Sequence, residues 1–251
     1  MAANTARPGG RGHLWLLLPA AALAALWLAW RALAAVDFLY PVFYDAMDIH
    51  GHIETFAPQN RYKADFGITT REERTRLFGE IVAAIHASGD GLAELRYHRP
   101  DGQVIDTLLR EPEVGHLQDV ANLVDRIAPI GWLALAWTAI HLLLIRLFEW
   151  RVPSLARLLG ASLVAVAAGV GIVLLVGARR VFYWLHELVF PPEHPWFFYY
   201  QDSLMATMMK APYLFGAIAA VLLAVGLVFY ALLLWVARQA PPTSGTAAPA
   251  K

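Results

Sequence analysis

The stretch IAPIGWLALAWTAIHLLLIRLF, residues 127–148, decides the fold class of this chain. It is long and apolar, and its most polar side chains are His141 and Arg146. A helix needs about 20 such residues to cross the hydrocarbon core of a bilayer. Three other stretches meet the same requirement, at residues 14–36, 155–178 and 211–237. We therefore predict an all-α membrane protein built on a four-transmembrane-helix bundle.

The composition of the whole chain agrees with this class. Of its 251 residues, 58% are hydrophobic and 16% are charged, whereas soluble domains are roughly 45–50% apolar. The formal net charge is zero, so nothing indicates a nucleic-acid partner, which would need a basic surface. The chain has no cysteine, which excludes disulfides, thiolate nucleophiles and cysteine metal ligands. We expect a monomer.

Basic residues in the short flanks set the expected orientation, because they concentrate on the cytoplasmic side of a membrane. They occur before the first span, between the second and third, and after the fourth: Arg7, Arg11, Arg146, Arg151, Arg157, Arg238 and Lys251. This pattern places the N-terminal tail (1–13) and the C-terminal tail (238–251) in the cytoplasm, and the Pro-, Ala- and Thr-rich composition of the latter predicts disorder. Residues 37–126 and 179–210 then face outward, although Arg179 and Arg180 oppose the trend.

The first outward segment, residues 37–126, is large enough to form a small α+β insert between the first two spans. Apolar residues at helical spacing predict a helix within residues 70–89. Residues 92–110 predict a hairpin that turns at the sequence Pro-Asp-Gly. A further helix is expected from about Pro112, because proline is favoured in the first turn of a helix.

The stretch REPEVGHLQDVANLVDR, residues 110–126, ends this insert and leads into the second span. His116 and Asp119 are three residues apart, so on a helix they occupy neighbouring positions. A carboxylate in that place can orient an imidazole and raise its basicity. The alternative is an ordinary amphipathic helix with an exposed His and Asp.

The stretch YWLHELVFPPEHPWFFYYQD, residues 183–202, forms much of the second outward segment. It places His186 beside Tyr183 and Glu187, and its aromatic residues suit an interfacial loop at the headgroup level. It begins like a zinc-binding H-E-x-x-H motif but lacks the second His. His194 is too far along for helical metal spacing, and Pro191 breaks the helix between. We therefore expect no metal.

The inventory of reactive groups narrows the chemistry. The chain contains no G-x-S-x-G elbow, no P-loop and no G-x-G-x-x-G fingerprint. What remains is histidine with carboxylate and tyrosine support, on the outward side of the membrane. This set of groups allows general acid–base catalysis by histidine, with His116 and His186 as the candidates.

The two stretches together resemble one family, the lipoprotein intramolecular transacylases of bacterial membranes, over residues 36–216. Its pattern has an acid and then His-x-x-Asp-Val before the second span, followed by a second His with downstream aromatic and proline residues. In this sequence the matching positions are Glu113, His116, Asp119, Val120, His186, Val189, Phe190, Trp196, Phe198, Asp202, Leu204, Pro212, Tyr213 and Phe215. The chain departs from the pattern at Leu185 and Val189, where larger apolar residues are expected.

The resemblance implies an enzyme of a bacterial cytoplasmic (inner) membrane, with its site on the extracytoplasmic side and no cofactor. Its substrate would be a diacylglyceryl lipoprotein held in membrane lipid. The α-amine of the N-terminal cysteine would take the sn-2 acyl chain, giving a lyso-form lipoprotein. His116 and His186 would be the acid and base, in an order the sequence leaves open. Residues expected to support them are Asp119, Glu113, Glu187, Trp196, Asp202 and Tyr183.

Two other classes of function stay open at the level of sequence. One is a different lipid acyltransferase or a lipid hydrolase that uses the same two histidines. The other is a non-enzymatic membrane protein whose insert acts as an extracytoplasmic sensor, in which both histidines would tolerate replacement.

Overall fold

Four long helices dominate the structure, a computed structural model that describes residues 11–150 and 152–239. They are α1 (Leu14–Ala34), α5 (Glu111–Leu147), α6 (Leu155–Val176) and α9 (Tyr213–Arg238). All four are long and apolar enough to cross a membrane, which confirms the predicted fold class. The predicted tails, 1–13 and 238–251, lie almost entirely outside the described residues.

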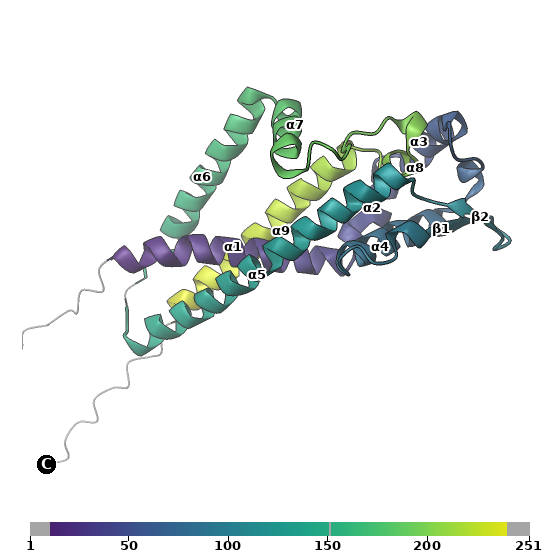
Figure 1. The fold of residues 1–251 in the computed structure, drawn as a ribbon. Coiled ribbons are helices and arrows are strands. Elements are labelled where there is room, and N and C mark those ends of the chain that lie inside the picture. Colours follow the sequence, from purple (N-terminus) through teal and green to yellow (C-terminus); the bar gives the residue numbers. More distant parts are fainter. Residues whose placement is uncertain (1–10, 151, 240–251) are drawn as a thin grey trace, which may run out of the picture.

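Helix α1 packs along both α5 and α9, and these three helices form the body of the bundle (Figure 1). Two glycines permit the close approach. Gly131 of α5 lies against the ring of Trp27, and Gly226 of α9 lies against Leu26. A side chain at Gly131 would overlap the indole, so the absence of a Cβ fixes how closely α1 and α5 cross.

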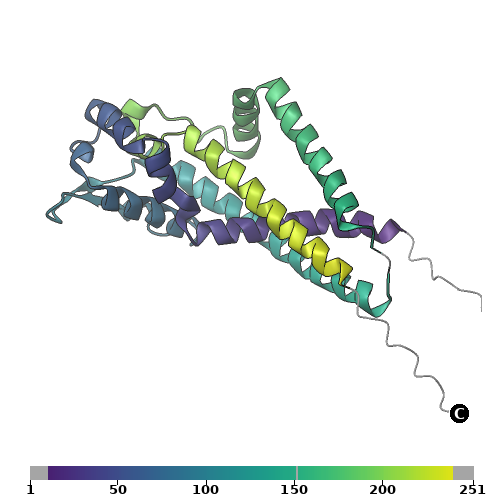
Figure 2. The same ribbon diagram turned by 180° about the vertical axis from the view of Figure 1, so that it is seen from behind.

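Helix α6 stands apart from the other three helices for most of its length (Figures 1 and 2). Leu158, near its start, is its one buried residue, and Ser162 Oγ lies 3.1 Å from Tyr230 Oη on α9. Gly177, with φ +97°, then makes the sharp turn into α7 (Ala178–Val189). Helix α6 is therefore fixed to the bundle at one end and carries α7 at the other.

The insert contains three helices and one hairpin. These are α2 (Tyr40–Ala46), α3 (Ile49–Phe56), α4 (Arg71–Ile85), β1 (Arg96–His98) and β2 (Val104–Thr107). The strands pair antiparallel, with Arg96 opposite Thr107, as the hairpin prediction required. Arg74 is fully buried in this insert, where it donates to the hydroxyls of Thr69 and Tyr44 and to the carbonyl of Gly67.

The boundary expected between the insert and the second span, at residues 126 and 127, is not a break in the structure. Helix α5 runs continuously from Glu111 to Leu147, and a capping box fixes its start. Residues 179–210 also differ from the expected loop, since they contain α7 and α8 (Leu204–Met208). The insert and α8 lie at the end of the bundle opposite the start of α1 and the end of α9 (Figure 1).

Candidate active site

One large cavity brings the two predicted histidines together. Its volume is about 940 Å³, and His116 of α5 and His186 of α7 both line it. The remaining walls come from α4, α8, the start of α9 and the segment 196–198. They are mostly aromatic and aliphatic, including Phe78, Ile81, Phe182, Phe190, Trp196, Phe198, Met205 and Phe215. The cavity is therefore an apolar chamber, and both predicted histidines lie in its wall.

His186 has one ring nitrogen fixed and the other free. Its Nδ1 lies 2.8 Å from the carbonyl of Phe182. A carbonyl can only accept, so Nδ1 carries the proton and Nε2 keeps its lone pair. Burial lowers the pKa of His186, although the bond to Phe182 opposes this shift. The indole of Trp196 holds the ring from the other side, with centroids 4.8 Å apart. His186 is thus oriented as a proton acceptor.

His116 lies one and a half turns after the start of α5, between two phenyl rings. Its ring centroid is 5.0 Å from that of Phe190 and 6.0 Å from that of Phe198. Burial lowers its pKa to about 4, and the neighbouring His186 contributes to the shift. Within the described part of the chain its Nδ1 is buried and has no hydrogen-bond partner. His116 is therefore neutral at pH 7, with a ring nitrogen left for a bound molecule.

Among the described residues Asp119 makes no hydrogen bond to His116, which corrects the expected orientation, although its charge raises the pKa of His116 against the larger opposing effect of burial. Its Oδ2 lies 2.6 Å from Nδ1 of His194, in the segment that follows α7. On the helix Asp119 points to a neighbouring stripe, and His194 offers a partner there. This pair ties the aromatic segment 190–198 to α5. The sequence indicated His194 only as a poor metal ligand. Its bond to Asp119 could not be foreseen, because the two residues are 75 positions apart.

Glu113 is buried and has a structural role. Its side chain accepts from Ser203 Oγ at 2.5 Å and from the backbone N–H of Arg110 at 2.9 Å. Burial raises the pKa of Glu113, while these hydrogen bonds oppose the rise. Ser203 also caps α8 by accepting from the N–H of Ala206. Glu113 therefore holds the start of α5, one turn before His116, against the start of α8.

The other predicted supporting residues divide into two groups. Tyr183 and Trp196 line the cavity and meet edge to face, with ring centroids 5.1 Å apart. Glu187 and Asp202 do not line it. Glu187 is exposed, and Asp202 forms an ion pair of 3.1 Å with Arg61. The sequence could not separate the groups, because neighbours in sequence point to different sides of α7 and η6 (Tyr200–Asp202).

A third histidine, His86, lines the cavity and was not foreseen. Its Nδ1 lies 2.8 Å from the carbonyl of Val82, and its Nε2 accepts from the indole N–H of Trp30 at 3.0 Å. Both ring nitrogens are therefore occupied. His86 anchors Trp30, another wall residue, and has no lone pair to offer a substrate.

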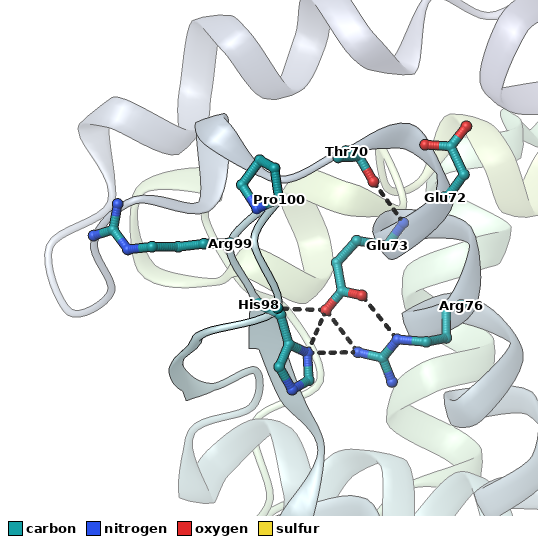
Figure 3. A pocket seen from close by; sticks show the side chains of 8 residues that line it. Thr70, Glu72, Glu73, Arg76, His98, Arg99 and Pro100 are labelled. Atoms are coloured by element: carbon teal, nitrogen blue, oxygen red, sulfur yellow. Dashed lines mark hydrogen bonds and ion pairs between the residues drawn. The ribbon is translucent and has the colours of Figure 1, made fainter.

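A second hollow, of about 530 Å³, lies on the insert at the start of α4 (Figure 3). Glu73 is at its centre and accepts from His98 Nδ1 at 2.8 Å and from Arg76 Nη2 at 2.6 Å (Figure 3). Glu73, His98 and Arg76 therefore bond to one another, and the exposed carboxylate of Glu72 also lines the hollow. Across residues 11–150 and 152–239, no three His, Asp or Glu side chains gather as a metal site. The histidine-lined cavity is the better candidate active site.

One comparison with known proteins finds a family match. Residues 94–215 match the family model described as lipoprotein intramolecular transacylase Lit, a span that includes both histidines. A comparison with curated protein sequences gives no significant match.

The fold matches solved in meso structures of the membrane integral lipoprotein intramolecular transacylase Lit from Bacillus cereus. One carries a histidine-to-arginine mutation; it is 16% identical, has a TM-score of 0.66, and the match covers 91% of this chain and 90% of that one. A histidine-to-alanine variant is 17% identical, with a TM-score of 0.65 and 91% of each chain covered. The predicted resemblance is confirmed: residues 94–215 match the lipoprotein intramolecular transacylase (Lit) family model, and the chain shares the fold of solved Lit structures, which supports an acyltransferase enzyme.

Proposed function

We propose that this enzyme moves the sn-2 acyl chain of a diacylglyceryl lipoprotein to the α-amine of the N-terminal cysteine. One observation carries the proposal: His116 and His186 share an apolar cavity whose wall has no Ser, Thr, Lys, Asp or Glu side chain among the described residues. The chain also has no cysteine. Acyl-enzyme intermediates form on such side chains or on His and Tyr, and we assign the two histidines to proton transfer. The attacking group in this proposal is therefore the amine of the substrate.

The geometry supports a division of roles between the two histidines. His186 presents the Nε2 lone pair and takes a proton from the substrate amine as that amine attacks the ester carbonyl. The C–N bond forms, the tetrahedral intermediate collapses, and the C–O bond to glycerol breaks. The glyceryl oxygen then receives a proton, from His186 or through His116. Atoms balance without water, because the product is an isomer of the substrate.

The apolar wall supports this chemistry in two ways. It suits acyl chains, and it holds amine and ester together, which can contribute about 7–11 kcal/mol when the geometry favours attack. It also carries no carboxylate among the described residues, so nothing there stabilises the ammonium form of the amine. The reactive, neutral amine is favoured as a result.

The location in the membrane is part of the same proposal. The insert and α8 lie at one end of the bundle, whereas the basic flanks Arg146 and Arg238 lie near the other. Basic flanks favour the cytoplasmic side. We therefore place the active site on the extracytoplasmic side of a bacterial cytoplasmic membrane, where the enzyme acts as a monomer on lipoproteins in the lipid.

Mass spectrometry of a lipoprotein N-terminal peptide tests the proposal. The protein is expressed in a host that makes only the diacylglyceryl form, beside variants His116→Ala and His186→Ala. Glu187→Gln is the matched control, since it follows His186 but does not line the cavity. We expect wild type and control to move one acyl chain to the amine at unchanged mass, and both histidine variants to fail. Loss of an acyl mass would indicate hydrolysis, and transfer by both histidine variants would refute the assigned chemistry.

A further inference from the structure

Arg179 stands out among the residues that line the cavity. Among the described residues it is the one Asp, Glu, Lys or Arg side chain in the wall, and no hydrogen bond or ion pair engages it there. It was also one of two arginines that opposed the orientation expected from the basic flanks. Its neighbour Arg180 is not in the cavity wall. Arg179 is also exposed, so its guanidinium is charged and is available to an anionic or strongly dipolar ligand in the cavity.

Arg179 lies on the same face of α7 as His186. Residues 179, 183 and 186 share this face, at the spacing of successive turns, and all three line the cavity. The guanidinium carbon of Arg179 lies 5.4 Å from the ring centroid of Tyr183, the residue between them on this face. Arg179 and His186 therefore lie on one wall of the cavity, about two helical turns apart.

The transfer reaction creates a need for such a group. When the amine attacks the ester, the carbonyl π electrons move to oxygen and the tetrahedral intermediate carries an oxyanion. Both histidines are neutral before the reaction, because burial lowers the pKa of each. The wall offers no other charged donor among the described residues. A planar guanidinium can donate two parallel hydrogen bonds to one oxygen or to neighbouring oxygens.

We propose that Arg179 is a catalytic residue that donates to the ester carbonyl oxygen and stabilises the oxyanion formed there. The proposal rests on the transacylase function proposed above. His186 takes the amine proton on one side of the reacting carbon, and Arg179 holds the carbonyl oxygen on the other. Collapse of the intermediate restores the carbonyl and releases the glyceryl oxygen, which takes up the proton. Arg179 keeps its own protons throughout.

The test compares Arg179→Gln and Arg179→Lys with the matched control Arg180→Gln. Purified full-length proteins in detergent micelles receive a synthetic diacylglyceryl lipopeptide, and kcat and KM are measured separately. Loss of one oxyanion donor typically lowers kcat about 10²–10³-fold. We expect that loss in Arg179→Gln with little change in KM, partial recovery in Arg179→Lys, and an unchanged Arg180→Gln. Melting temperatures confirm that each variant is folded.

Several outcomes would overturn the assignment. A rise in KM at constant kcat would make Arg179 a binding group for a lipid headgroup or peptide. Equal losses in Arg179→Gln and Arg180→Gln would indicate a general effect of interfacial charge. Full activity of Arg179→Gln beside an inactive His186→Ala would leave the transacylase function standing and remove only the role of Arg179. An inactive wild type would instead remove the proposed function.

Discussion

Lowering the pH should weaken the folded protein through His116 in particular. Burial lowers the pKa of His116 to about 4, whereas an unfolded histidine titrates near 6.5. Between these two values the unfolded chain binds a proton that the folded protein does not, so the free energy of unfolding falls as pH falls. One pKa unit corresponds to about 1.4 kcal/mol. From pH 7.5 to pH 5, His116 alone should therefore cost about 2 kcal/mol of stability.

The measurement is denaturant unfolding in detergent micelles at pH 7.5, 6 and 5, on wild type and on His116→Gln. Glutamine is neutral at every pH and close to imidazole in size. All other histidines are common to the two proteins, so the difference between their pH profiles isolates His116. We expect the variant to lose about 2 kcal/mol less than wild type between pH 7.5 and pH 5. The loss should begin below pH 6.5 and level off near pH 4.

Two results would refute this reasoning. Parallel profiles for wild type and His116→Gln would mean that His116 titrates alike in the folded and unfolded states. A wild type that becomes more stable than the variant as pH falls would mean that a nearby acid stabilises the imidazolium. In that case the ring would serve as a charged acid, and the neutral pair assigned to the cavity would be wrong.

Two further sets of variants test how the helices and the site are held in place. Gly131→Ala would put a Cβ 2.4 Å from the ring of Trp27, while Gly115→Ala on the same helix meets nothing within 4 Å. We expect a melting-temperature loss equivalent to about 1–3 kcal/mol for Gly131→Ala and no loss for Gly115→Ala. Equal melting temperatures would refute the close crossing of α1 and α5. Asp119→Asn and His194→Gln each remove the bond between these two residues. Each should free the aromatic segment 190–198 and lower kcat/KM, and the double variant should be no worse than either single variant. Additive losses would show that the two residues act separately.

The sequence alone was enough to predict the membrane class, the insert and the two histidines of the candidate site. The spans followed from apolar length, because the thickness of a bilayer fixes how many residues a helix needs to cross it. The hairpin followed from Pro100, Asp101 and Gly102, whose backbone preferences act locally. His116 and His186 followed from recognisable neighbours in the chain and from a shared expected side of the membrane. Each of these inferences needs only residues that are close together in sequence.

The tertiary structure alone decided which side chains meet. Asp119 bonds to His194, 75 positions away, and not to His116. Glu113 bonds to Ser203, 90 positions away. Among the described residues, Arg179 is the one Lys or Arg in the cavity wall, because α7 folds back from the end of α6. Local patterns assign a residue to a helix and a face, but its partner depends on how separate helices pack. Packing is fixed by contacts such as Trp27 on Gly131, which hydrophobic periodicity does not specify.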